Sequence, residues 1–212
     1  PAIDSAHFEE IRPYLLLAER VGALHTQLMG GHLRRIVCQY QGVIREYATA
    51  PLTAAVLKGV MATTTDEPIT HVNARMFAER RGIKVEESKS DHQDYNNLVT
   101  VVCETSEETT SISATVFGKR DARLIRLDDI EVKAKLEGHM VVLSNKDVPG
   151  VVGRLGTLLS EANINIADMA LGRKDAGGEA IMVFNIDGAA SDEMLHHIAE
   201  EDFIYWVKQV KL

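Results

Sequence analysis

The sequence predicts an α+β fold made of two small domains, and three patterns support this class. Residues 137–212 alternate between strand-like and helix-like stretches in the order β-α-β-β-α-β, the ferredoxin-like arrangement in which four antiparallel strands carry two helices on one face. Residues 31–136 contain several strand-like stretches and two helical ones, which indicates an α+β domain with an antiparallel sheet. Residues 1–30 form one long helical pattern without a core of its own.

The N-terminal helix is predicted over residues 4–29, where apolar residues recur at helical spacing until Gly30 and Gly31 end the pattern. A lone helix of this kind is either the last element of a preceding domain or a linker between domains. The chain starts at Pro1 rather than at methionine, so we expect a piece cut from something longer.

The first domain begins at residues 33–40, where apolar and polar residues alternate as in a half-buried strand. One helix is predicted to start at residues 49–51, and a second to follow Asn73 as its N-cap and to end with Gly82 as the C′ residue. The other expected elements are a short strand at 83–86, a polar loop at 87–97, and strands at 98–104, 110–117, 123–127 and 130–136.

Basic residues gather in the last part of this domain, inside an otherwise acidic protein. Such a cluster is either a solvated strand face or a pocket for a phosphate or carboxylate, because the planar fork of arginine suits both anions. The sequence leaves both interpretations open. The cluster consists of Lys119, Arg120, Arg123, Arg126, Lys133 and Lys135.

The second domain opens with an apolar strand at residues 140–143, a polar loop and an amphipathic helix. Pro149 is placed at the first helical position, where its fixed φ and missing N–H fit, and Gly150 leaves the backbone N–H groups open. We expect the sheet face opposite the helices to be left for a partner. The remaining elements are strands at 164–171 and 179–186 around a hairpin loop at 172–178, a helix at 192–201 capped by Ser191, and a strand at 205–210.

The polar loop of this domain places the carboxylate of Asp147 and the amide of Asn145 beside a helix N-terminus. The free N–H groups and the dipole of a helix N-terminus favour negative charge. Such a site can hold a zwitterion, with the ammonium on Asp147 and the carboxylate on the helix end. The alternative is that Asp147 only caps the helix.

Composition excludes several classes of function. The chain of 212 residues is 45% hydrophobic and 25% charged, which is ordinary for a globular protein, and its net charge of −8 speaks against nucleic acid and anionic membrane as partners. The sequence contains no membrane span and no signal peptide, so we expect a cytoplasmic location. Cys38 and Cys103 stand alone in strand-like stretches, which favours reduced, packed thiols and no metal site.

Motifs in both halves of the chain resemble known families. In the second half, the segments NKDVPG, NINIA and LGRKDAGGEA resemble those of an ACT domain, the small amino-acid-sensing module of many biosynthetic enzymes. In the first half, PYLLLAERVGALHTQL and VNARMFAERRGIKV resemble segments of the long-form D-3-phosphoglycerate dehydrogenase family. The residues that carry the ACT resemblance are Asn145, Asp147, Pro149, Gly150, Asn165, Gly172, Arg173, Gly177 and Gly178.

The resemblance implies that the chain is the regulatory portion of such an enzyme. No G-x-G-x-x-G follows a strand, so the chain has no dinucleotide fingerprint, and none of the family's catalytic residues can be placed. We therefore expect no catalytic residue and no cofactor in this chain, whereas the full-length enzyme would use NAD. Residues 1–30 would be the helix returning from the catalytic portion, 31–136 the intervening domain and 137–212 the ACT domain.

By the same resemblance, the chain would bind L-serine at an interface between ACT domains and so exert feedback control on serine biosynthesis. The binding residues would be Asn145 and Asp147, in the turn with Pro149 and Gly150, together with Asn165 of a neighbouring subunit in a homodimer or tetramer. A second site in the intervening domain would bind an anion or phosphorylated substrate through Arg123 and Lys135, and Arg173 is a further candidate for anion binding.

Two alternatives remain at this point. The domains could be an oligomerisation scaffold without ligand sensing, or they could regulate an iron–sulfur serine dehydratase, which has similar domains. The N-terminal helix motif favours the dehydrogenase over the dehydratase.

Overall fold

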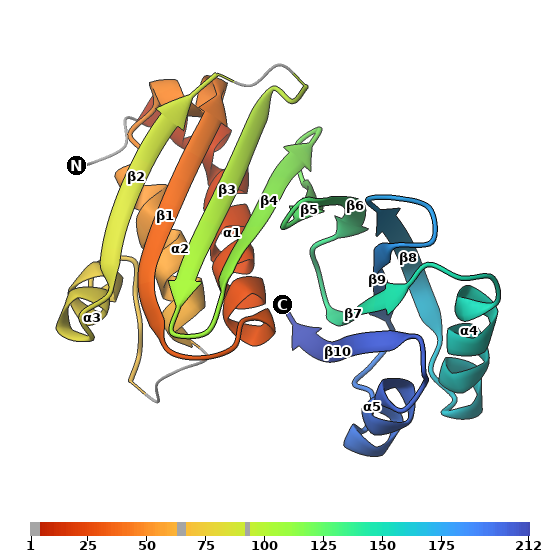
Figure 1. The fold of residues 1–212 in the computed structure, drawn as a ribbon. Helices are drawn as coiled ribbons and strands as arrows, with labels where there is room; N and C mark the ends of the chain where they lie inside the picture. The colour runs from red at the N-terminus through yellow and green to blue at the C-terminus, as the bar shows by residue number, and fades with distance from the viewer. Residues whose placement is uncertain (1–4, 63–66, 92–93) are drawn as a thin grey trace. The chain divides into compact units, whose positions relative to one another are not determined.

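The structure, a computed structural model, describes residues 5–62, 67–91 and 94–212, with the side chains of residues 5–9 excepted, so the predicted start of the first helix at residue 4 lies outside the described residues. The chain forms two compact units, Pro1–Leu124 and Ile125–Leu212 (Figure 1). Among the described residues, no helix has the length and apolar character needed to cross a membrane. The predicted α+β class is confirmed in both units.

The first unit packs helices against a sheet in which the strand order runs β2-β1-β3-β4. Figure 1 shows α1 and α2 together on one face of this sheet. The predicted alternation in the first strand is confirmed, because Ile36, Cys38 and Tyr40 are buried and their neighbours are more exposed. The elements are α1 (Ser5–Leu28), β1 (Leu33–Gly42), the 3-10 helix η1 (Val43–Glu46), α2 (Ala50–Ala62), α3 (Ala74–Arg80), β2 (Lys84–Ser90), β3 (Asn97–Thr105) and β4 (Thr109–Phe117).

Strand β2 differs from the sequence prediction in length and direction. Residues 87–90, expected to be loop, continue the strand, and β2 runs parallel to β1 from Arg35 opposite Lys84 to Gln41 opposite Ser90. The strands β1 and β3 are antiparallel, so the sheet is mixed. Because β2 is an exposed edge strand, its side chains need no apolar alternation, and the sequence pattern therefore gave no sign of it.

The ends of α3 were predicted with one error. Gly82 follows the C-cap residue with φ +72°, as expected of a C′ glycine. Asn73 occupies the N-cap position but does not cap the helix, because its side-chain oxygen accepts a hydrogen bond from the backbone N–H of Thr70 at 2.7 Å.

The second unit contains the predicted β-α-β-β-α-β order, and its four-stranded antiparallel sheet has the order β10-β7-β9-β8. Helices α4 and α5 share one core with alternate residues of the strands, including Val141, Leu143 and Phe184. Strand β5 (Asp121–Leu127) crosses the boundary between the units. The second unit's elements are β6 (Ile130–Lys135), β7 (His139–Lys146), α4 (Val151–Glu161), β8 (Ile166–Arg173), β9 (Glu179–Ile186), α5 (Asp192–Ala199) and β10 (Ile204–Lys211).

Strand β6 covers part of the sheet face that was expected to be open. A Cβ atom built on Gly172 of β8 would lie 1.9 Å from the carbonyl oxygen of Glu131, so only glycine allows β6 to approach this closely. The buried side chain of Asn185 in β9 donates hydrogen bonds to the carbonyls of Lys135 and Glu137 at 3.2 and 3.0 Å. The expectation that this face is left for a partner is therefore wrong over β8 and β9.

Candidate functional site

The loop between β7 and α4 contains the main predicted site residues, but its geometry differs from the prediction. Helix α4 begins at Val151 and Gly150 is its N-cap, with φ +97°, so Pro149 lies before the helix and not at its first position. No side chain caps α4, and the carboxylate of Asp147 is directed elsewhere. The capping interpretation of Asp147 is therefore wrong.

Asp147 is bound by the loop between β8 and β9. Its Oδ2 accepts hydrogen bonds from Nη1 of Arg173 at 2.6 Å and from the backbone N–H of Gly177 at 3.1 Å. Its own backbone N–H donates to the carbonyl of Gly178 at 2.8 Å. The Gly177 N–H and then the Arg173 guanidinium lower the pKa of Asp147, so the carboxylate stays ionised at neutral pH.

Asn145 lies at the end of β7, and only 1% of its surface is exposed. Its side-chain amide donates to the carbonyl of Lys146 at 2.8 Å, whereas its Oδ1 is buried with no hydrogen-bond partner among the described residues. An unpaired buried acceptor is costly, and each one in a folded protein calls for an explanation, such as a functional role or a bound water or ion. Asn145 is therefore an available acceptor beneath the loop that contains Asp147.

Asn165 lies beyond the other end of α4. It is exposed, its amide donates to Oδ2 of Asp187 at 2.7 Å, and it borders a shallow hollow with Gly156 and Ser160 of α4. Since α4 has 11 residues, at about 1.5 Å per residue it is roughly 16 Å long. One small amino acid cannot contact Asp147 and Asn165 of the same unit.

An apolar surface lies on the same side of the unit as this hollow. Strand β8 is at the edge of the sheet and exposes 42% each of Met169 and Leu171, which face the same side as Phe184 and Met182. On α4, Val152 is 43% exposed, and a Cβ atom on Gly156 would meet nothing within 4 Å. The unpaired edge of β8 and the small residues of α4 leave room for a second chain.

The three predicted anion-binding residues do not form one cluster. In the first unit, Nε of Arg123 donates to Oδ1 of Asp121 at 2.8 Å. In the second unit, Nζ of Lys135 lies 4.0 Å from Oδ2 of Asp168 on β8. Arg173 lies five residues beyond Asp168 on β8, so the two residues are roughly 17 Å apart at about 3.3 Å per residue. The guanidinium of Arg173 is bound to the carboxylate of Asp147.

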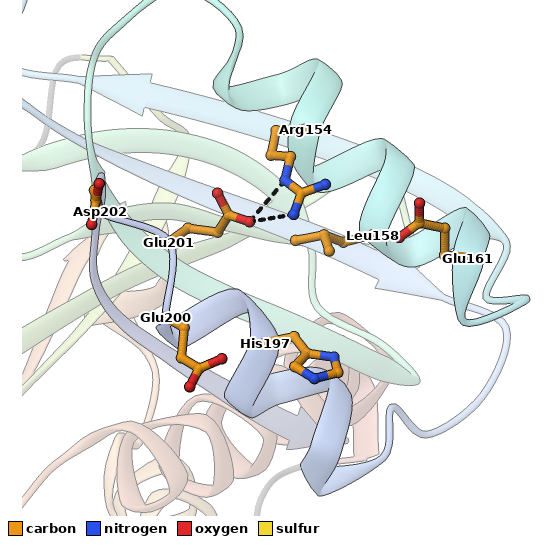
Figure 2. Close-up of a pocket in the computed structure, with 7 residues that line it drawn as sticks. All are labelled: Arg154, Leu158, Glu161, His197, Glu200, Glu201 and Asp202. Atoms are coloured by element: carbon orange, nitrogen blue, oxygen red, sulfur yellow. Dashed lines mark hydrogen bonds and ion pairs between the residues drawn. The ribbon is translucent and has the colours of Figure 1, made fainter.

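A second hollow lies between α4 and α5 (Figure 2). Figure 2 shows Arg154 and Glu201 facing each other across it, and both Nε and Nη2 of Arg154 lie 2.7 Å from Oε1 of Glu201. The other charged residues that line it are mostly acidic. No group of three or more His, Cys, Asp or Glu that could hold a metal occurs in the part of the chain that the structure describes. The hollow is lined by Arg154, Leu158, Glu161, His197, Glu200, Glu201 and Asp202.

Sequence reasoning missed the contact between the two loops. Arg173 was assigned to the anion site and not to Asp147, and the backbone of Gly177 and Gly178 was given no role at Asp147. The strand order would have revealed the contact, because β7 pairs with β9 and Lys146 lies opposite Glu179, which puts the turn before β9 beside Asp147.

Comparison with known families gives the class of this chain. Residues 10–128 match the family model of the D-3-phosphoglycerate dehydrogenase intervening domain, and residues 139–198 match that of the ACT domain. The fold and these matches define a regulatory chain in which an intervening domain is followed by an ACT domain. The chain belongs to the D-3-phosphoglycerate dehydrogenase family and corresponds to its C-terminal regulatory portion, without a catalytic or nucleotide-binding domain.

The sequences of similar proteins align with all or nearly all of this chain. It is 32% identical to the D-3-phosphoglycerate dehydrogenase of Bacillus subtilis over 100% of this chain and 41% of the relative. It is 33% identical to the D-3-phosphoglycerate dehydrogenase of Archaeoglobus fulgidus, over 100% of this chain and 41% of the relative. It is 31% identical to that of Methanocaldococcus jannaschii, over 94% of this chain and 38% of the relative. The chain thus spans about 40% of the length of these relatives.

Proposed function

We propose that this chain is the sensor of a D-3-phosphoglycerate dehydrogenase and that it binds L-serine between the ACT domains of two subunits. Binding would favour one arrangement of the intact enzyme and so regulate serine biosynthesis, by the difference in affinity between its states. The proposal rests on the positions of Asp147 and Asn165, which lie beyond opposite ends of α4, so that only residues of two subunits could bind one amino acid together.

A two-fold pairing of second units would bring these residues together. If the β8 edges of two copies pair antiparallel, their α4 helices run in opposite directions, and Asp147 of one copy lies near Asn165 of the other. The same pairing buries Met169 and Leu171 and satisfies the open backbone edge of β8. A homodimer therefore forms two equivalent sites.

The chemistry of the site suits a small zwitterion. Asp147 is ionised and can bind an ammonium group, and the amide of Asn165 can bind a carboxylate or hydroxyl. The unpaired Oδ1 of Asn145 is a further acceptor if the loop above it moves when ligand binds. The nicotinamide chemistry of the enzyme would belong to its catalytic domains.

Isothermal titration with L-serine tests the proposal. We expect saturable binding to the natural chain and its loss in Asp147→Asn, which keeps the shape of the side chain but removes its charge. Glu201→Gln, in the second hollow, is the matched control and should bind as the natural chain does. Absence of binding at millimolar L-serine, or equal binding by both variants, would contradict the proposal.

Sedimentation tests the dimer that the site requires. Leu171→Glu places a charge on the apolar edge and should give monomers that no longer bind L-serine. If the natural chain is a dimer but L-serine neither binds nor stabilises it, the chain is an oligomerisation scaffold, an alternative that the exposed edge of β8 also supports.

We also propose a second, anion-binding site at Arg123 in the first unit. The guanidinium of Arg123 is only partly exposed, and its Nε donates to Asp121, which fixes the orientation of the planar group. Titration with phosphate and with 3-phosphoglycerate should show binding that Arg123→Gln weakens. Equal affinities in both proteins would remove this residue from the site.

A further inference from the structure

In the pair formed by Asp147 and Arg173, each side chain has hydrogen-bonding groups that bond to nothing in the described part of the chain. Both hydrogen bonds to the Asp147 carboxylate end on Oδ2, and its Oδ1 has no partner among the described residues. Arg173 donates through Nη1, and its Nε and Nη2 groups likewise bond to nothing in the described part of the chain. The Arg173 side chain is 53% exposed. A free carboxylate oxygen and free guanidinium N–H groups therefore lie side by side.

The turn that follows Arg173, the last residue of β8, is held on both sides. On one side, Gly177 and Gly178 are hydrogen-bonded to Asp147, and Gly177 has φ +76°, which a residue with a side chain rarely adopts. On the other, Nζ of Lys174 forms an ion pair with Asp129 in the turn after β5. The guanidinium is thus oriented before any ligand binds, which reduces the entropy cost of using it.

We propose that Arg173 binds the carboxylate of the same amino acid whose ammonium Asp147 binds. The two charged groups of an α-amino acid are attached to one carbon atom, and the carboxylate of Asp147 and the guanidinium of Arg173, in direct contact with each other, offer the complementary charges side by side. This inference rests on the proposed function and moves Arg173 from the anion site to the amino-acid site. The ligand class is then α-amino acids whose ammonium and carboxylate groups are both free. The side chain of the ligand would contact residues of the second copy.

Titration of natural and variant chains with L-serine and L-serinamide tests the role of Arg173. L-serinamide keeps the ammonium and the hydroxyl but has a neutral amide in place of the carboxylate. Loss of a charge-assisted pair should make Arg173→Gln bind L-serine roughly tenfold to a hundredfold more weakly. Its affinity for L-serinamide should equal that of the natural chain, and Arg173→Lys should restore part of the L-serine affinity.

A control and three outcomes separate this inference from the function on which it rests. Arg154→Gln removes an arginine of the second unit that is also paired with a carboxylate, and it should leave both affinities unchanged. If Arg173→Gln weakens both ligands equally, Arg173 only positions Asp147 and the inference fails. Unchanged or tighter binding of L-serine by Arg173→Gln also refutes it. If the natural chain binds no L-serine, the proposed function fails first, and the variants are not needed to show it.

Discussion

Acidification should destabilise the first unit through the buried imidazole of His25. This side chain in α1 is 1% exposed, its Nε2 lies 2.7 Å from Oγ1 of Thr110, and its Nδ1 has no hydrogen-bond partner in the described part of the chain. Burial lowers the pKa of His25 from 6.5 to about 4. The folded unit therefore keeps the ring neutral where the unfolded chain already binds a proton.

The sign and size of this effect follow from linkage. Because the folded pKa is depressed, the stabilisation is complete above pH 6.5 and is lost as the pH falls toward 4. At about 1.4 kcal/mol for each pKa unit, the full loss is about 3 kcal/mol, of which about 2 kcal/mol is reached by pH 5. Protonation of the carboxylates whose pKa values are lowered also reduces the free energy of unfolding, but mainly at a more acidic pH than the protonation of His25. These carboxylates are Glu86, Glu131 and Asp147.

Urea unfolding between pH 8 and pH 5 measures the effect, with hydrogen exchange of β3 and β4 peptides to report the first unit separately. His25→Gln does not titrate and keeps an amide near Thr110, so its free energy of unfolding should fall by about 2 kcal/mol less than that of the natural chain. The exposed His197, replaced by Gln, is the control and should preserve the natural pH dependence. A natural chain with flat stability over this range, or a His25→Gln variant with the same slope, would refute the reasoning.

Two further predictions concern the packing of α1 against α2 and the hydrogen bonds of Asn185. Gly59→Ala should lower the free energy of unfolding by about 1–3 kcal/mol or more, because its Cβ would lie 2.0 Å from the carbonyl oxygen of Glu19 where α2 crosses α1. Gly188→Ala, with nothing within 4 Å, is its control in urea unfolding. Asn185→Ala should cost about 1–3 kcal/mol in the second unit, because two backbone carbonyls of residues 135–137 lose their donor. Amides of β9 that exchange no faster in this variant would contradict the account.

Most of the second unit could be predicted because its pattern is strong and local. Apolar residues of β7 and α4 change from strand to helix spacing within one loop, and glycine turns mark the hairpin between β8 and β9. The alternation of β1 and the length of α1 were likewise readable from the sequence. In each case the information lies within one element or within the short loop that joins two consecutive elements.

The features that could not be predicted depend on contacts between elements. Residues 87–90 of β2 are polar on both faces, so only pairing with β1 makes them a strand. Asp147 has the sequence signs of a helix cap, but a turn far along the chain supplies its partners. Asn145 follows an apolar run as a loop residue would, and its burial results from the strand pairings of β7 with β9 and β10.

The contact between Gly172 and β6 affects how the ACT domain of this chain could be transferred to another protein. A graft that begins at His139, where the ACT match starts, would remove the strand that lies against Gly172 and would leave the amide of Asn185 without its carbonyl acceptors. One that begins at Ile125 would carry this cover along. In this molecule, the transferable unit therefore starts inside β5, several residues before its recognisable sequence motif.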